Sequence, residues 1–468
     1  MQHSYTNKRI HFVGISGIGM SAIAQVLARR GVFVTGSDMN RGPIFRRLAR
    51  LGGQCWLGHH HKHIQGAELV VYSPAVPRDN CELEAARKKG IPTIPRAKML
   101  NILAEESECI GISGSHGKST TSWLVGHLLL EAGLDPTIMV GAKAEGLKGN
   151  ARDGLGKYFV AEVCESDGIF ANLKSALAVV TNIDAEHLDY YASLEDVQEH
   201  FRCFINNSAD RLGAVVWADD EHTMSVAQSS EARFITYGFG EADLRARVLQ
   251  ISGKGSVYEV DWNGRSLGKF RTPLLGRFNV LNTLAAVAVG LRLEIPLKTI
   301  RKSIAVNAGV DRRLSLRGCV RGIMLWDDYG HHPTETQAAL EALRPAVKGK
   351  LIVVFQPHRY TRTSYLSQEF GRSFSLADHL LVTQIYPAGE QPVEGVTGRL
   401  IVDEAHKQNH PSAEFIAEKE FIPARLTQLA QPGDAILFQG AGDINRQIKE
   451  TAQQLKSEQV TMTERNVG

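Results

Sequence analysis

Residues 108–121 read E-C-I-G-I-S-G-S-H-G-K-S-T-T, and this stretch decides the fold of the middle of the chain. Its apolar start predicts a buried strand, its glycines predict a turn, and the pattern from Lys118 to Ala132 predicts a helix. A strand that runs through a glycine turn into a helix is the setting of a phosphate-binding loop. The stretch therefore predicts a parallel α/β unit with an anion site at this turn.

The residues of the turn suit the phosphates of ATP. Glycine lets backbone N–H groups face an anion, the helix start adds partial positive charge, and Lys118 supplies a full charge. Ser119 offers a hydroxyl to a magnesium ion. Because Ile112 stands at the first glycine of the usual motif, a purely structural turn remains the alternative. The candidate ATP-binding residues of the loop are Gly114, Ser115, His116, Gly117, Lys118, Ser119 and Thr120.

Acidic and histidine side chains follow the next two predicted strands. E-V-C-E-S-D occupies residues 162–167, and T-N-I-D-A-E-H-L-D occupies residues 181–189. Ligands bind α/β sheets at the edge where the strands end, and magnesium prefers carboxylate oxygens. These segments are therefore candidates for a metal site, with helix capping by Asp and Glu as the alternative.

A second glycine turn lies near the start of the chain. The strand pattern I-H-F-V leads into Gly14, Gly17 and Gly19, and the following helical stretch leads to a strand that ends at Asp38. Asp38 is placed where an acidic residue reaches a ribose hydroxyl, but Ser16 stands where a nucleotide-binding turn has its middle glycine. The turn leaves open a structural role, a bound nucleotide and a dinucleotide-dependent oxidoreductase.

Strand and helix patterns alternate along the rest of the chain. We expect three α/β domains with parallel sheets: a Rossmann-like N-terminal domain, a P-loop-type ATP-binding central domain and a Rossmann-like C-terminal domain. The expected bounds are 1–105, 106–313 and 314–468. The central domain should also contain a β-rich excursion between residues 234 and 275, where the pattern is typical of hairpins.

The composition excludes several classes of protein. Fifty-three basic and 50 acidic residues give a net charge of +3, far short of the basic excess of a nucleic-acid-binding protein. The start of the chain lacks the apolar stretch of a secretory signal, and no segment reaches the ~20 apolar residues of a membrane span. The six cysteines include no Cys-x-x-Cys pair, which fits reduced thiols. We expect a cytoplasmic protein that binds neither nucleic acid nor membranes.

Residues 59–63 read H-H-H-K-H. No carboxylate or cysteine lies beside them at the spacing of a metal site. We expect this run to be a solvated loop.

Four further segments carry a resemblance to a known family. They are G-R-F-N-V-L-N at 276–282, W-D-D-Y-G-H-H-P-T-E at 326–335, F-Q-P-H-R-Y-T-R-T at 355–363 and G-A-G-D-I at 440–444. Together with the segments quoted above, and in this order, they resemble the Mur ligases over essentially the whole chain. The family usually has threonine where this chain has Ser115 and Ser119, and aspartate where it has Cys164.

The resemblance implies a three-domain, ADP-forming ligase. The first domain would bind a UDP-sugar, the second ATP and magnesium, and the third the incoming amino acid. In the members that the chain resembles most, the carboxylate of UDP-N-acetylmuramate attacks the γ-phosphate of ATP, and the amine of L-alanine then attacks the acyl phosphate.

The resemblance also implies roles for individual residues. The implied catalytic residues are Lys118, Glu162, His187, Arg313 and Asp328. Ser119, Glu162 and His187 would hold the metal, while Asn279, Asn282, Arg313 and Asp328 would complete the ATP site. The UDP-sugar residues would be Gly14, Ser16, Gly17, Gly19, Ser37, Asp38 and Ser73. Tyr329, His331, Arg359 and Arg362 would bind the carboxylate of the amino acid.

Three other functions compete with this interpretation. Within the family, a recycling ligase attaches a whole tripeptide to the same UDP-sugar. A dinucleotide-dependent oxidoreductase would leave the phosphate loop and the third domain unexplained. A nucleotide switch without catalysis is disfavoured by Lys118, Glu162 and His187.

Overall fold

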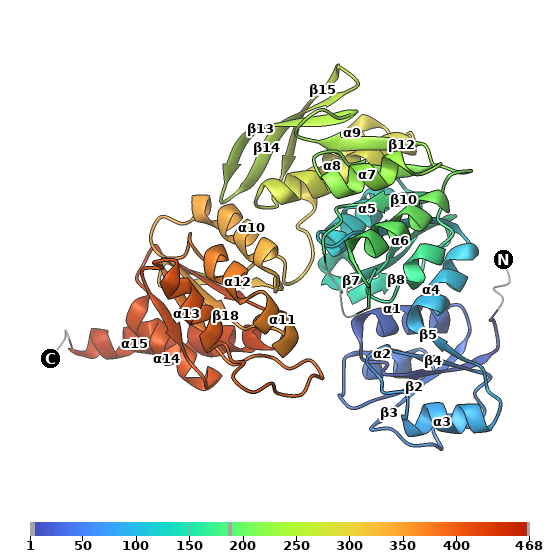
Figure 1. Ribbon diagram of the computed structural model, residues 1–468, viewed down its shortest axis with the longest axis horizontal. Coiled ribbons are helices and arrows are strands. Elements are labelled where there is room, and N and C mark those ends of the chain that lie inside the picture. The colour runs from blue at the N-terminus through green and yellow to red at the C-terminus, as the bar shows by residue number, and fades with distance from the viewer. Residues whose placement is uncertain (1–4, 148, 186–189, 466–468) are drawn as a thin grey trace. The chain divides into compact units, whose positions relative to one another are not determined.

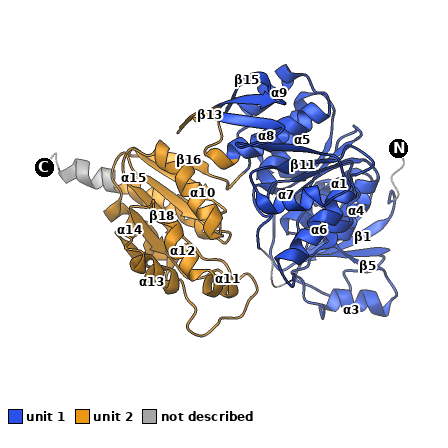
Figure 2. Ribbon diagram, turned by 45° about the horizontal axis from the view of Figure 1, so that its top comes forward, with its two compact units in different colours: residues 1–247, 258–272, 279–310 blue, residues 248–257, 273–278, 311–468 orange. Residues whose placement is uncertain are grey.

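A computed structural model describes residues 5–147, 149–185 and 190–465 (Figure 1). The chain divides into two compact units (Figure 2). Unit 1 comprises residues 1–247, 258–272 and 279–310, and unit 2 comprises residues 248–257, 273–278 and 311–468. Within the described residues the chain forms three sheets, two of them mainly in unit 1 and one in unit 2.

The N-terminal sheet of unit 1 is a Rossmann-like parallel sheet, as predicted. Its strand order is β3-β2-β1-β4-β5, and every pair is parallel. The apolar strand β1 lies at its centre, with Ile10 and Phe12 fully buried, because helices cover both faces of such sheets. The strands are β1 (Arg9–Val13), β2 (Phe33–Asp38), β3 (Gln54–Leu57), β4 (Leu69–Tyr72) and β5 (Thr93–Pro95). The helices are α1 (Ile18–Arg29), α2 (Ile44–Arg50), α3 (Cys81–Lys88) and α4 (Arg96–Glu105).

The second sheet of unit 1 has the order β15-β14-β13-β12-β11-β10-β6-β9-β7-β8. The strand of the phosphate loop, β6, lies between β9 and β10 and is parallel to both. The predicted β-rich excursion is confirmed, and β12 to β15 extend the sheet. The strands are β6 (Glu108–Ser113), β7 (Thr137–Ala144), β8 (Gly149–Arg152), β9 (Tyr158–Glu162), β10 (Leu177–Val180), β11 (Ala214–Trp217), β12 (Phe234–Gly238), β13 (Leu244–Ser252), β14 (Gly255–Trp262) and β15 (Arg265–Thr272). The helices are α5 (Lys118–Glu131), α6 (Leu194–Asn206), α7 (Glu221–Gln228), α8 (Arg277–Arg292) and α9 (Leu297–Val306).

The sheet of unit 2 has the order β16-β17-β21-β18-β19-β20. It is parallel except for the edge strand β16, which pairs antiparallel with β17. Separate apolar clusters, one containing Val353 and one containing Val354, cover its two faces, as in other doubly wound sheets. The strands are β16 (Ser315–Val320), β17 (Ile323–Asp328), β18 (Leu351–Phe355), β19 (His379–Val382), β20 (Ala413–Phe415) and β21 (Ala435–Gln439). The helices are α10 (Pro333–Leu343), α11 (Tyr360–Tyr365), α12 (Ser367–Ser373), α13 (Arg399–Lys407), α14 (Ile422–Leu429) and α15 (Gln447–Arg465).

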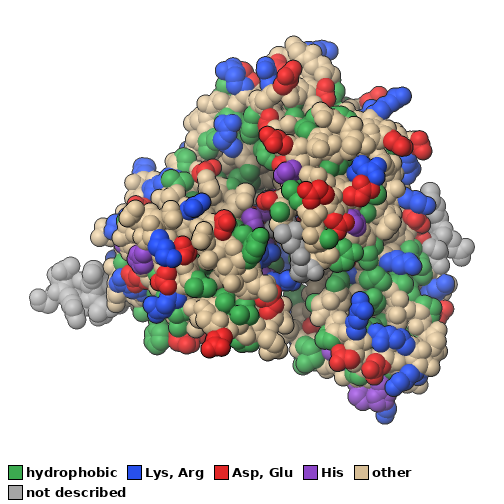
Figure 3. Space-filling view, viewed as in Figure 1, with side chains coloured by type: hydrophobic (Ala, Val, Ile, Leu, Met, Phe, Trp, Pro, Cys, Tyr) green, Lys and Arg blue, Asp and Glu red, His purple; other side chains and the backbone are tan. Residues whose placement is uncertain are grey.

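The surface agrees with the balanced charge of the sequence. Acidic and basic side chains are interspersed on the face that Figure 3 shows. In the part of the chain that is described, no helix is both long and apolar enough to cross a bilayer. The six cysteines are all free thiols.

Candidate active site

The phosphate loop joins β6 to α5 through two glycines with positive φ. Gly114 has φ +131° and Gly117 has φ +82°, conformations that L side chains rarely adopt. A Cβ at Gly114 would lie 2.1 Å from Thr181 Oγ1, and one at Gly117 would lie 2.5 Å from Asn282 Oδ1. The loop backbone thus packs closely against Thr181 at Gly114 and against Asn282 at Gly117, which leaves no room for a Cβ at either position.

Lys118 begins α5, and its ammonium group lies back over the loop. Nζ donates to the carbonyl oxygens of Gly114 and Ser115, the latter at 2.9 Å. It also lies 2.9 Å from Glu165 Oε1, whose side chain is 3% exposed. A full positive charge is therefore fixed at the start of a helix, next to the turn that the sequence assigns to phosphates.

Ser119 and Glu162 meet beside the same loop. Ser119 Oγ donates to Glu162 Oε1 at 2.9 Å, and the backbone N–H of Gly141 donates to Glu162 Oε2 at 2.5 Å. Magnesium prefers oxygen ligands such as the hydroxyl of Ser119 and the carboxylate of Glu162, which ends β9. These two residues therefore fit that ion. His187, the third predicted metal residue, lies outside the described residues.

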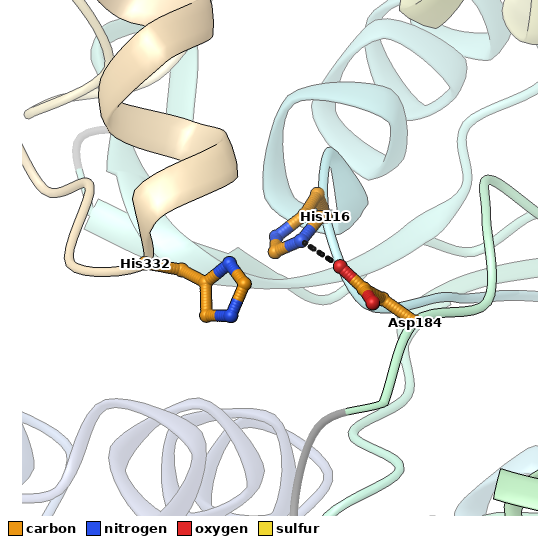
Figure 4. A group of neighbouring side chains, drawn as sticks. All are labelled: His116, Asp184 and His332. Atoms are coloured by element: carbon orange, nitrogen blue, oxygen red, sulfur yellow. Dashed lines mark hydrogen bonds and ion pairs between the residues drawn. The ribbon is translucent and has the colours of Figure 1, made fainter. Parts of the chain in front are cut away.

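The segment after β10 closes the other side of the loop. Asn182 accepts from the backbone N–H of Ser115 through its carbonyl, at 3.1 Å, and from that of His116 through its side chain, at 2.8 Å. Ser115 Oγ accepts from the N–H of Asp184 at 2.8 Å. His116 Nε2 lies 3.5 Å from Asp184 Oδ2 (Figure 4). The loop is thus held by polar groups from a neighbouring strand end.

The predicted asparagines of α8 also pack on the loop. Asn279 and Asn282 are 5% and 6% exposed. Asn282 Oδ1 accepts from Thr121 Oγ1 at 3.2 Å, and Asn282 Nδ2 donates to Asn279 Oδ1 at 3.0 Å. The structure therefore brings these asparagines, Lys118, Ser119 and Glu162 together in unit 1.

The glycine turn of the N-terminal sheet is organised by β2. The carbonyl oxygen of Ser37 accepts from the backbone N–H groups of Gly14 and Ile15, at 2.9 and 3.0 Å. Asp38 Oδ2 accepts from the N–H of Ser16 at 2.8 Å. Instead of disrupting the turn, the Ser16 hydroxyl donates to the carbonyl of Asn40 at 2.7 Å. A serine is therefore compatible with an ordered turn at this position.

The other predicted UDP-sugar residues border the same turn. Gly17 immediately precedes α1, which contains Gly19. A Cβ at Gly14 would lie 3.0 Å from the Cβ of Ser73, which follows β4. All seven predicted residues thus lie at or near the carboxyl ends of β1, β2 and β4, the edge where such sheets bind ligands.

A cavity of about 640 Å³ opens beside Ser73, where β4 ends. Its lining includes Tyr72 and Arg78 from the N-terminal part and Asp167 from the loop after β9. Asp167 Oδ2 is buried without a hydrogen-bond partner among the described residues, and burial raises the pKa of this carboxyl group. The cavity therefore borders both the N-terminal sheet and the segment that carries Glu162 and Glu165.

In unit 2, the structure brings the two predicted residues Arg313 and Asp328 together, because Asp328 contacts the backbone of Leu314, the residue after Arg313. Arg313 Nη1 lies 3.1 Å from Glu335 Oε1, and its guanidinium group is 5.5 Å from the ring of Tyr329. Asp328 is 5% exposed and accepts from the N–H groups of Leu314 and Gly330, at 2.9 and 2.8 Å. Burial raises the pKa of Asp328. Asp328 therefore fixes the backbone beside Arg313 within unit 2.

The predicted carboxylate-binding residues gather where β17 and β18 end. The ring of His331 lies 5.6 Å from that of Tyr329 and 5.4 Å from that of His358. Arg359 and Arg362 belong to the segment that enters α11. Arg362 Nη1 is buried and has no hydrogen-bond partner among the described residues. A buried guanidinium N–H of this kind suits an anionic ligand, because an arginine fork matches a carboxylate.

The two histidines of this group are held neutral. Burial lowers the pKa of His331 to about 3 and that of His358 to about 4. The positive charge of Arg362 lowers both pKa values further. The group is therefore a cationic arginine site lined by uncharged imidazoles.

The sequence prediction missed two features. Glu165, the carboxylate that pairs with Lys118, was quoted only as part of a segment, and the signal for it was its place just after β9. The expectation that residues 59–63 form a solvated loop was wrong for His59 and His63. Both are hydrogen-bonded to Glu82, which is 0% exposed. That pairing depends on a residue about twenty positions away in sequence.

Parallel sheets with a glycine loop, a lysine and acidic groups at their carboxyl edge define a multidomain α/β protein of the phosphate-loop type. Comparison with known families is more specific. Residues 9–108 match the Mur ligase family catalytic domain, residues 112–290 the Mur ligase middle domain, and residues 312–442 the Mur ligase glutamate ligase domain. The chain belongs to the Mur ligase family.

Relatives of known name cover nearly the whole chain. It is 42% identical over 450 residues to the UDP-N-acetylmuramate–L-alanine ligase of Geotalea daltonii, covering 96% of this chain and 98% of the relative. The crystal structure of UDP-N-acetylmuramate-alanine ligase from Thermotoga maritima is 28% identical, with a TM-score of 0.82 over 96% of this chain and 99% of that one. A murein peptide ligase from Psychrobacter arcticus, 22% identical, shares the fold with a TM-score of 0.70 over 96% and 99% of the two chains.

Proposed function

We propose that this protein is an ADP-forming ligase that joins L-alanine to the carboxylate of UDP-N-acetylmuramate in the cytosol. The observation that carries the proposal is the phosphate loop with Lys118, Ser119 and Glu162 at its side, in a chain whose near-full-length relatives bear that activity in their names. An oxidoreductase would use the N-terminal turn alone and leave these residues without a role.

The chemistry explains why such charges are needed. A carboxylate is a poor electrophile, and its negative charge repels the γ-phosphate of ATP that it must attack. Transfer of the phosphoryl group to the carboxylate forms an acyl phosphate and releases ADP; attack by the amine of alanine then forms the amide and releases phosphate. Phosphoryl transfer depends mainly on positioning and on neutralising charge.

In unit 1, Lys118 and the start of α5 supply positive charge to the phosphates. Glu165 keeps the Lys118 ammonium group at the loop. Ser119 and Glu162 would hold a magnesium ion, with His187 as a further candidate, and that ion supplies charge neutralisation when bound. Asn279 and Asn282 buttress the loop from α8 and offer amide groups to the nucleotide.

The edge of the N-terminal sheet supports a site for the UDP-sugar. The glycine turn would take the diphosphate, and Asp38 the ribose. The neighbouring cavity at Ser73 offers room for the sugar, with the Asp167 carboxyl as an acceptor for its donors. Residues 1–105 would then form the UDP-sugar domain, 106–313 the ATP domain and 314–468 the domain that receives the amino acid.

Unit 2 supports a site for the α-carboxylate of alanine. Arg362 presents a buried N–H without a hydrogen-bond partner among the described residues, and Arg359 begins the same short helix. Because His331 is neutral, the arginines supply the positive charge that attracts the carboxylate. Arg313, held against Glu335 and Tyr329, is a candidate for the nucleotide phosphates.

An ADP-release assay of the purified protein tests the proposal. Magnesium, ATP, UDP-N-acetylmuramate and L-alanine are omitted one at a time. We expect ADP only when all four are present, because the acyl phosphate needs the sugar acid and turnover needs the amine. ADP formation that is independent of the UDP-sugar would refute the proposal and favour a nucleotide switch.

A further inference from the structure

Glu82, near the start of α3, is a carboxylate that the chemistry described above does not use. Its side chain is 0% exposed. A buried charge is costly unless hydrogen bonds replace the water that it loses. Burial opposes ionisation of Glu82, but the nearby His11 imidazole and the hydrogen bond from Ser37 outweigh it and lower its pKa to about 2.

Three imidazoles converge on Glu82. His63 Nδ1 lies 2.7 Å from Oε1, His59 Nδ1 lies 3.2 Å from Oε2, and His11 Nε2 lies 3.5 Å from Oε2. Because an ionised carboxylate only accepts hydrogen bonds, the facing ring nitrogens of His59 and His63 act as donors. The backbone N–H of His60 also donates to Oε1, at 3.2 Å. Glu82 therefore anchors the loop that follows β3.

Within this loop, the residues that face Glu82 differ from those that face water. The ring of His63 stacks on Trp56 with centroids 4.6 Å apart. His60, His61 and Lys62 are exposed. Figure 3 shows histidine side chains gathered at the surface of the N-terminal part. Within residues 59–63, His59 and His63 therefore hold the loop to Glu82, and the three residues between them face solvent.

Glu82 is also linked to the glycine turn. Ser37 Oγ donates to Glu82 Oε2 at 2.5 Å, while the Ser37 carbonyl accepts from Gly14 and Ile15. The carbonyl oxygen of Asp38 accepts from the N–H of Gly58 at 2.8 Å, which ties the loop after β3 to the end of β2. One buried carboxylate thus joins the segments at the carboxyl ends of β1, β2 and β3.

We propose that Glu82 is a positioning residue for the nucleotide half of the UDP-sugar. It holds Ser37, the glycine turn and the loop at residues 58–63 in a single arrangement at the binding edge. Both of its oxygens already accept hydrogen bonds from protein donors, so it acts through these groups and does not touch the ligand. The inference rests on the proposed function, because it assigns the UDP-sugar to this edge.

The test compares Glu82→Gln with the unaltered protein by calorimetry, using UDP, UDP-N-acetylmuramate and ADP as ligands. A glutamine amide cannot accept at both positions, so the turn and the loop should lose their shared anchor. We expect the dissociation constants for UDP and the UDP-sugar to rise about ten-fold or more. The constant for ADP should stay within about two-fold, and kcat at saturating UDP-sugar should change little. Glu84→Gln, an exposed carboxylate on the same helix, is the matched control and should match the unaltered protein.

His63→Ala keeps the test decisive if Glu82→Gln does not fold. It removes one donor to Glu82 without altering a residue assigned to the UDP-sugar, and it should weaken UDP more than ADP. A folded Glu82→Gln protein that binds UDP normally, or loses UDP and ADP alike, would overturn the inference. Absence of UDP-sugar binding by the unaltered chain would instead overturn the proposed function and, with it, this inference.

Discussion

Lys118 supplies a full positive charge at the phosphate loop, and its contacts make a direct prediction. Lys118→Ala removes the ammonium group that Gly114, Ser115 and Glu165 hold at the loop. We expect turnover to fall about 100-fold or more, because such groups act mainly on developing charge. Lys174→Ala, at an exposed lysine, should be neutral in the same ADP-release assay. Normal turnover by the Lys118 variant would remove the loop from the ATP site.

Arg362 allows a similar test on the amino-acid side. Arg362→Lys keeps the charge but loses the planar pair of donors that a carboxylate engages. We expect KM for L-alanine to rise about ten-fold or more, while KM for ATP changes little. Steady-state kinetics with each substrate varied in turn measure this difference. An unchanged KM for L-alanine would exclude Arg362 from the carboxylate site.

His331 and His358 predict an unusual pH response. Their pKa values in the folded protein, about 3 and about 4, lie below the usual value near 6.5. The folded state therefore binds fewer protons than the unfolded state below pH 6.5, and their contribution to stability declines as the pH falls from there. NMR titration of the ring C–H signals should find both imidazoles neutral down to about pH 5. A midpoint near 6.5 for either would contradict the burial of this site.

Two glycines that flank helix α5 allow the packing of the phosphate loop to be tested. Gly117 precedes the helix in the loop, and Gly133 follows its end. Gly117 and Gly133 both have positive φ, +82° and +74°, but only Gly117 has a neighbour within reach of an added Cβ. Alanine at either position costs about 1–3 kcal/mol of backbone strain. Gly117→Ala should in addition displace Asn282 and raise KM for ATP, whereas Gly133→Ala should lower the melting temperature alone. Equal kinetics for the two variants would contradict the packing of α8 on the loop.

The elements also show how far sequence reasoning reaches. Strands β6, β9 and β10 were predictable, because their short apolar runs end in glycine or acidic turns. Strands β7, β8, β16 and β20 were not predicted. β8 reads G-N-A-R and β16 reads S-L-R-G-C-V, and such strands at sheet edges are specified by their partners more than by their own pattern.

The same limit applies to the candidate site. The loop residues 114–120 follow from local pattern, because strand, turn and helix are contiguous. The pairing of Lys118 with Glu165 spans 47 positions, and that of His11 with Glu82 joins β1 to α3. Contacts of this kind depend on sheet order, which a single sequence does not specify. Glycine positions were therefore predicted, and contacts between buried polar side chains far apart in sequence were not.

In the whole molecule, the two units supply different groups to the proposed reaction. The phosphate loop and the edge proposed for the UDP-sugar belong to unit 1, and the arginine site proposed for the amino acid belongs to unit 2. Under the proposed function, ligation would use groups from both units, and the choice of amino acid would depend on unit 2. The rival within the family, a ligase for a whole tripeptide, would use the same chemistry in unit 1.

The specificity constant for the amine substrate therefore tests the claim that this protein ligates L-alanine to UDP-N-acetylmuramate. ADP release is measured with UDP-N-acetylmuramate and, in turn, L-alanine, glycine, L-serine and L-Ala-γ-D-Glu-meso-diaminopimelate. We expect L-alanine to have the highest specificity constant, with that of glycine about 10- to 200-fold lower, since one methyl group is worth only about 1–3 kcal/mol. L-Serine should react slowly and the tripeptide hardly at all. A higher kcat/KM for the tripeptide than for L-alanine would contradict the claim and identify a recycling ligase instead.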